Sequence, residues 1–73
     1  METLADYYIG RNVKIIERYN KLVVDMKGNR AITQVGEEFD VSPHTVKRIL
    51  YSKAYPYAAE AHEIVNNKSK EEL

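Results

Sequence analysis

Side chains that donate hydrogen bonds crowd the stretch 41–55, which carries three basic residues and no acidic one. On a helix, His44, Lys47, Arg48 and Tyr51 fall on a common outer face. Guanidinium and ammonium groups donate charge-assisted bonds to phosphate oxygens and to acceptor atoms on the edge of a nucleobase. The segment therefore predicts a surface that recognises an anionic, acceptor-rich partner rather than one that breaks covalent bonds.

The sequence contains no arrangement of residues suited to catalysis or to metal binding. Glu37 and Glu38 are adjacent, so on a helix they point to different faces, and no nucleophile accompanies them. His44 and His62 lie far apart and the chain has no cysteine, which leaves no set of ligands at zinc spacing. We expect both histidines on the surface, no cofactor, no metal site and no enzymatic activity.

Four helices are expected to position the basic segment. Apolar residues recur at spacings of three and four, which is the pattern of helices that bury one face. The expected helices span residues 11–27, 30–39, 43–53 and 56–67. Residues 1–10 are expected to form an N-terminal arm or an extension of the first helix, and residues 67–73 a polar, mobile tail.

Capping residues mark the boundaries of these helices. Ser42 is a typical N-cap, and Pro43 suits the first position of the third helix because its missing N–H is not needed there. Gly28 follows a basic last turn and predicts a left-handed C-cap for the first helix, while Asn29 predicts the N-cap of the second. Gly10 weakens a continuous helix through the N-terminal residues.

The stretch 32–51 combines a short helix, a three-residue break and a second short helix. Gly36 supplies a small residue at the helix contact, Val41 an apolar turn residue, and Asp40 stands where glycine is common. This arrangement resembles the helix-turn-helix DNA-binding motif, and the helix after the turn resembles its recognition helix. The resemblance implies an all-α, tri-helical domain over residues 11–66, with a fourth C-terminal helix.

Upstream residues extend the resemblance. The segment from Arg11 through Tyr19, followed by Gly28 and the motif, is similar to the tri-helical cores of small phage and mobile-element regulators. Mor-type transcription activators and region 4 of sigma factors are the nearest likenesses. The resemblance implies a small bacterial or phage transcription regulator that binds double-stranded DNA sequence-specifically and is cytoplasmic and associated with the nucleoid.

In a docked motif of this kind, the second helix lies in the major groove. Lys47 or Arg48 would read the O6 and N7 acceptors of guanine, whereas phosphate contacts would fix the register. The residues expected to contact DNA are Ser42, Pro43, His44, Thr45, Lys47, Arg48 and Tyr51, together with Thr33 and Gln34 near the start of the preceding helix.

The net charge qualifies this expectation. The 73-residue chain has a formal net charge of zero, which by itself does not indicate a nucleic-acid partner. The net charge is zero because basic and acidic segments of the chain cancel. Residues 11–30 carry six basic and two acidic residues, whereas residues 31–40 carry three acidic residues and no basic one. We therefore expect separate basic and acidic surfaces, and a modest non-specific affinity for DNA.

Other functions and partners stay open on the sequence alone. A phage protein for DNA packaging or replication would use the same motif, and a protein-interaction module, such as an anti-activator of a transcription factor or RNA polymerase, fits the neutral charge better. A homodimer through the fourth helix or the segment 4–9 suits a two-fold DNA site. The alternative is a monomer in which both segments close the core. No apolar run is long enough to cross a membrane.

Overall fold

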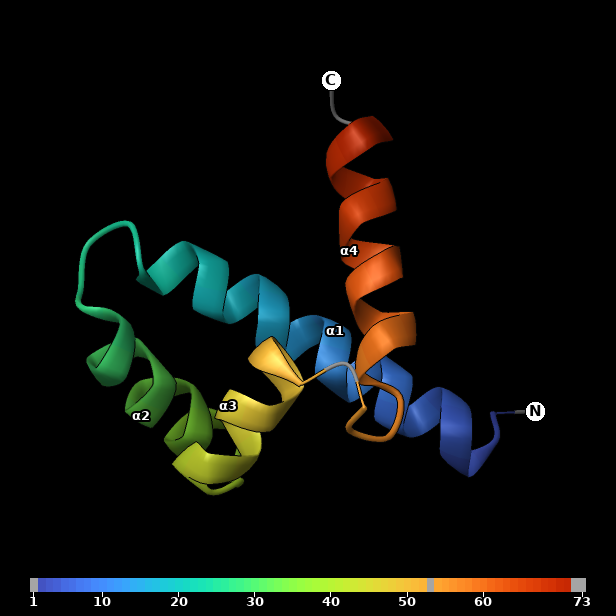
Figure 1. Cartoon of the computed structure of the whole chain (residues 1–73), viewed down its shortest axis with the longest axis horizontal. Coiled ribbons are helices and arrows are strands. Elements are labelled where there is room, and N and C mark those ends of the chain that lie inside the picture. Colours follow the sequence, from blue (N-terminus) through green and yellow to red (C-terminus); the bar gives the residue numbers. More distant parts are fainter. Residues whose placement is uncertain (1, 53, 72–73) are drawn as a thin grey trace.

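The structure, a computed structural model, describes residues 2–52 and 54–71, with side chains for residues 2–52 and 54–68. This part of the chain forms four helices and no strand, which confirms the all-α prediction. The helices are α1 (Leu4–Leu22), α2 (Gly28–Phe39), α3 (Pro43–Tyr51) and α4 (Ala58–Glu71). Figure 1 shows α2 and α3 below α1, with the C-terminal end of α3 reaching α1, and α4 standing against the N-terminal half of α1.

The N-terminal residues extend the first helix. Thr3 and Asp6 form a reciprocal capping box, in which the Asp6 N–H donates to Thr3 Oγ1 at 3.1 Å and the Thr3 N–H donates to Asp6 Oδ2 at 3.2 Å. The helix then runs through Gly10 and ends at Leu22, earlier than the predicted residue 27.

The predicted roles of Gly28 and Asn29 are wrong. Gly28 is the first residue of α2, no described glycine has a positive φ, and Lys27 is the N-cap without a side-chain hydrogen bond. A Cβ on Gly28 would lie 3.3 Å from the Tyr19 hydroxyl. Gly28 therefore makes room for a side chain of α1 instead of reversing the chain.

The turn between α2 and α3 depends on two residues. Asp40 adopts the left-handed conformation, with φ 56° and ψ 45°, as its type and place predicted. The Val41 N–H donates to the Gly36 carbonyl at 2.9 Å. A Cβ on Gly36 would lie only 2.7 Å from the Val41 carbonyl oxygen, so only glycine lets the turn approach α2 this closely.

The boundaries of the last two helices partly match the prediction. Ser42 caps α3, because its Oγ accepts the Thr45 N–H at 3.1 Å, and Pro43 begins the helix. The helix ends at Tyr51, short of residue 53, which lies outside the described residues. The fourth helix continues to Glu71, so residues 67–71 are helical where a tail was predicted.

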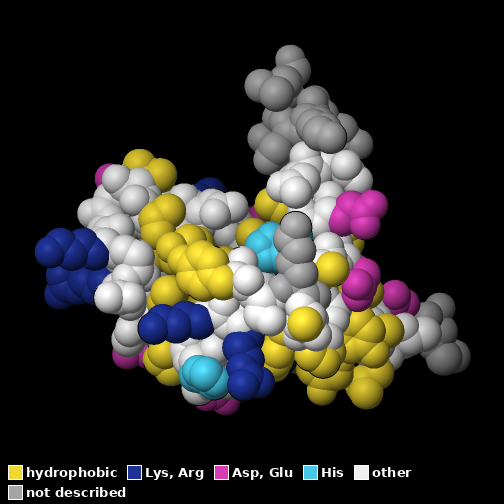
Figure 2. All heavy atoms as spheres, in the orientation of Figure 1, with side chains coloured by type: hydrophobic (Ala, Val, Ile, Leu, Met, Phe, Trp, Pro, Cys, Tyr) yellow, Lys and Arg dark blue, Asp and Glu magenta, His cyan; other side chains and the backbone are white. Residues whose placement is uncertain are grey.

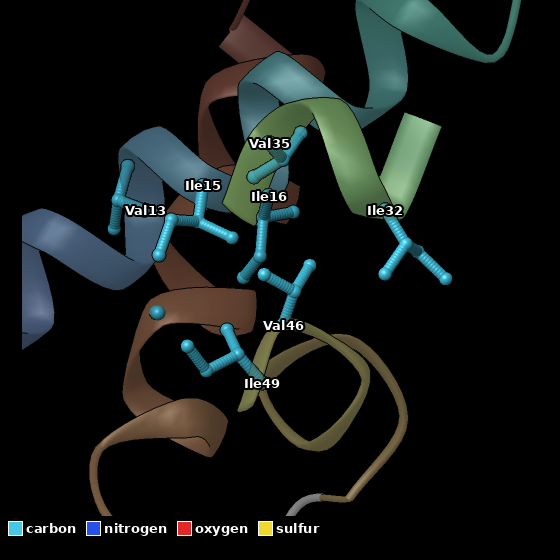
Figure 3. Close-up of a cluster of buried hydrophobic side chains, with 8 residues drawn as sticks. Val13, Ile15, Ile16, Ile32, Val35, Val46 and Ile49 are labelled. Atoms are coloured by element: carbon cyan, nitrogen blue, oxygen red, sulfur yellow. The ribbon is translucent and has the colours of Figure 1, made fainter. Parts of the chain in front are cut away.

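The core is aliphatic and draws on all four helices. Figure 3 shows side chains of α1, α2 and α3 pointing toward one another. The members of this cluster are Val13, Ile15, Ile16, Ile32, Val35, Val46, Ile49 and Ala61. Burial of these side chains is the main favourable contribution to the stability of such a small domain.

Two polar contacts connect α1 and α4 to the C-terminal end of α3 and to the segment that follows it. Asn12 is fully buried, and its Nδ2 donates to the Pro56 carbonyl at 3.5 Å. His62 Nε2 lies 2.9 Å from the Ile49 carbonyl oxygen, to which it can donate from the appropriate tautomer. The expectation that both histidines are simply surface residues is therefore wrong for His62, which connects α4 to α3.

Candidate nucleic-acid interface

One face of α3 carries the predicted DNA-contacting side chains. At about 100° per residue, Pro43, His44, Lys47, Arg48 and Tyr51 occupy an arc of about 140°, and all five are exposed. The opposite arc holds Val46 and Ile49, which are fully buried. Figure 2 shows Lys and Arg side chains beside a histidine over this part of the molecule. The core thus fixes which face of α3 points outward.

The basic groups on this face are not neutralised locally. The sequence of α3 contains no acidic residue. Within the described part of the chain, ion pairs form only at Arg18–Glu38 and Lys68–Glu17, so neither Lys47 nor Arg48 takes part in one. Both charges are consequently available to an external anion.

The hydroxyl groups predicted to contact DNA are partly engaged within the protein, and Thr45 lies outside the exposed arc and is half-buried. Ser42 Oγ and Thr45 Oγ1 lie 3.0 Å apart, and the Tyr51 hydroxyl lies 2.9 Å from the Tyr19 hydroxyl of α1. Each pair uses one of its two hydroxyl hydrogens, which leaves one donor per pair for a phosphate. The Tyr51 bond, followed by burial, raises the pKa of the Tyr19 hydroxyl.

Gln34 and Thr33, on α2, make bonds within the protein. Gln34 Nε2 donates to Glu38 Oε2 at 2.8 Å, and Thr33 Oγ1 donates to the Asn29 carbonyl at 3.1 Å. Gln34 must therefore break or share a bond with a carboxylate before it can contact a phosphate. These two residues are weaker candidates than those on α3.

The basic residues of α1 do not extend the α3 face. Lys14, Arg18 and Lys21 lie about 180° around α1 from the mean direction of its buried residues, Asn12 and Val13 among them. Because α3 packs on the buried side of α1, the two basic surfaces point in different directions. The distribution of charge along the sequence does not reveal the direction in which each basic surface points.

Lys27 and Arg30 are candidate contacts that sequence reasoning missed. Both side chains are exposed at the start of α2. Figure 2 shows Lys and Arg side chains at the rim of the same face that presents α3. The N-terminus of a helix attracts phosphate through its free N–H groups, and nearby cations add to that attraction. The signal available in the sequence was the basic block that ends at residue 30.

An ion pair joins α1 to α2 behind this interface. Arg18 Nε donates to Glu38 Oε1 at 2.8 Å, and Nη2 donates to Oε2 at 3.1 Å. The hydrogen bond from Arg18, and next that from Gln34, lowers the pKa of the Glu38 carboxyl below its ordinary value of 4.5. Ionised Glu38 therefore stabilises the folded state above about pH 4.5, and this contribution is lost as the pH falls through the lowered pKa.

The Glu38→Gln variant is expected to reduce the thermal midpoint at neutral pH and to have less effect in acid. The effect should be small and should shrink with added salt, because the pair is exposed. Thermal unfolding followed by circular dichroism between about pH 3 and pH 7 checks this. Glu37→Gln removes the same charge from an exposed neighbour, and equal changes in the two pH profiles would contradict the assignment to Glu38.

Comparisons of the chain with protein-family models, curated proteins and solved structures found no match. The likeness to a helix-turn-helix thus depends on the residues and geometry of the chain itself. Among the described residues, no three His, Asp or Glu side chains gather where they could hold a metal ion. In that same part, no helix is both long enough and apolar enough to cross a membrane.

Proposed function

We propose that this protein binds double-stranded DNA sequence-specifically, with α3 in the major groove, as a small bacterial or phage transcription regulator. The observation that carries the proposal is the outer face of α3, where His44, Lys47 and Arg48 are exposed on a helix without acidic residues. The major groove is about 12 Å wide and admits an α-helix, whose diameter with side chains is about 10–12 Å.

The surroundings of α3 support the same proposal. The close turn at Gly36 and Asp40 holds α3 against α2, and the core directs its apolar side inward. Base contacts would come from Lys47 and Arg48, because these two side chains can reach guanine O6 and N7. Ser42, Thr45 and Tyr51, with Lys27 and Arg30, would contact phosphates and set the register.

The test is binding of the purified protein to random and genomic duplex DNA at several salt concentrations. Affinity is expected to fall as salt rises, since displaced counterions drive part of the binding. Lys47→Ala combined with Arg48→Ala should weaken specific binding at least about tenfold while circular dichroism stays unchanged. The matched control is Lys14→Ala with Lys21→Ala. It removes two charges from the solvent-facing side of α1, opposite its buried residues, and should change affinity much less.

Two outcomes would contradict the proposal. If the protein has no affinity for DNA even at low salt, the neutral net charge points instead to a protein-interaction module such as an anti-activator. If the two double variants weaken binding equally, the contacts are non-specific and do not centre on α3. A role in phage DNA packaging or replication would retain the DNA affinity, and genomic neighbours would distinguish it from regulation.

A further inference from the structure

A surface rich in tyrosine lies at the start of α1 and at the corner before α4. On α1, Leu4, Tyr7, Tyr8 and Arg11 follow the i, i+3, i+4, i+7 spacing of a single helix face. Leu4 is 73% exposed and Tyr7 is 56% exposed, so this stripe is not part of the core. Figure 2 shows hydrophobic side chains gathered over the start of α1 and below the base of α4. We call these four residues and the corner 55–57 the tyrosine surface.

The tyrosine surface contains a hollow beside its exposed side chains. Tyr8, Arg11, Tyr55, Pro56 and Tyr57 line an open hollow of about 310 Å³. The rings of Tyr8 and Tyr57 are stacked with centroids 6.1 Å apart, and the Arg11 guanidinium lies 5.0 Å from the centre of the Tyr8 ring. Tyrosine and arginine are among the residue types most enriched at the energetically dominant positions of protein interfaces.

Backbone strain coincides with this hollow. Tyr57 has a φ of 64°, which is rare for an aromatic residue and strains the backbone. Strain of this kind concentrates at binding surfaces, where the surrounding contacts hold the residue in place. The conformation leaves Tyr57 36% exposed at the edge of the hollow, while Tyr8 covers one side of its ring.

The shape of the tyrosine surface fits a second copy of the same chain. A two-fold contact requires one surface to contain both the protruding and the receiving part. Leu4 and Tyr7 protrude beside the hollow, so each copy can place these side chains in the hollow of the other. Figure 1 shows the first turns of α1 extending past the base of α4, where a second chain has access.

Charge along α1 favours an antiparallel arrangement of the two helices. The first ten residues contain Glu2 and Asp6 and no basic residue. The next eleven contain four basic residues and Glu17 as the only acidic one. Antiparallel α1 helices would place the acidic segment of each copy beside the basic segment of the other.

We propose that a second copy of this chain docks on the tyrosine surface, with the two α1 helices antiparallel, to form a homodimer. Tyr55 and Pro56 also line a hollow with Arg48 and Ser52 at the C-terminal end of α3. The dimer contact would thus border the outer face of α3 at Arg48, and the dimer would present two α3 helices. The inference of self-association does not depend on the proposed DNA binding.

Sedimentation equilibrium without DNA, from about 1 μM to about 1 mM protein, tests the proposal. The wild-type mass should rise with concentration toward twice 8.5 kDa. Leu4→Ser with Tyr7→Ser should weaken association at least about tenfold with unchanged circular dichroism, because both side chains are exposed in the single chain. Val24→Ser, at a site 79% exposed in the turn after α1, should leave association unchanged.

Three results would overturn the proposal. A wild-type chain that stays at 8.5 kDa up to about 1 mM does not self-associate, and the surface would belong to another protein partner. A dimer that survives the double substitution uses a different surface, such as α4. A dimer weakened equally by Val24→Ser depends on general apolar exposure. None of these results bears on DNA binding, because no DNA is present.

Discussion

The Ile49→Ala variant is expected to lose about 2–5 kcal/mol of unfolding free energy. Ile49 lies on α3, is fully buried, and packs in the cluster shared by all four helices (Figure 3). Truncation removes favourable burial and leaves a cavity that the surrounding helices can fill only in part. Proteins have total stabilities of about 5–15 kcal/mol, so this loss is a large part of the stability of so small a domain.

Urea unfolding followed by circular dichroism measures this loss. Ile64→Ala is the matched control, because Ile64 lies on α4 and is 38% exposed. It should lose less than about 1 kcal/mol. Equal losses at the two positions would mean that α3 is not held by the core in the manner described. DNA affinity of Ile49→Ala should fall in proportion to the unfolded fraction, unlike that of a variant that removes a contact.

The Gly36→Ala and Gly10→Ala variants are expected to have opposite effects on stability. A Cβ at Gly36 would lie 2.7 Å from the Val41 carbonyl oxygen, and relief requires movement of the turn backbone. We expect a net loss of about 1–2 kcal/mol, since overpacking outweighs the better helix propensity of alanine. At Gly10 the added methyl group meets nothing within 4 Å, so alanine should gain about 0.5–1 kcal/mol.

Thermal midpoints provide the measurement, because about 1 kcal/mol shifts the midpoint of a domain this small by about 4–8 °C. Gly36→Ala should also weaken DNA binding in the folded protein, since the turn that sets α3 against α2 must widen. If both substitutions stabilise the chain, helix propensity dominates and the close approach at Gly36 has no energetic importance.

Local chemistry explains which parts of the fold could be predicted. Ser42 and Pro43 define the start of α3 through bonds within three residues, and Asp40 reverses the chain through its own tolerance of positive φ. Helical spacing indicated the buried faces for the same reason. These features depend on neighbours in sequence, so a sequence displays them.

Contacts between distant helices explain what could not be predicted. Glycine is a typical C-cap residue, but Gly28 begins α2, where it makes room for the hydroxyl of Tyr19 nine residues earlier. Among the candidate site residues, Gln34 is hydrogen-bonded to Glu38 and Tyr51 to Tyr19. The direction of the α1 charges and the link from His62 to α3 likewise depend on packing between helices.

The packing of α4 has a consequence during translation. Ala61, which completes the cluster around Ile49, and His62, which bonds the Ile49 carbonyl, both lie on α4. Ribosomes add about 5–20 residues per second and release the chain N-terminus first. While α4 is still inside the ribosomal tunnel, α1, α2 and α3 are exposed without this cover. We therefore expect α4 to add its contacts to Ile49 after the turn at Gly36 and Asp40 has set α3 against α2.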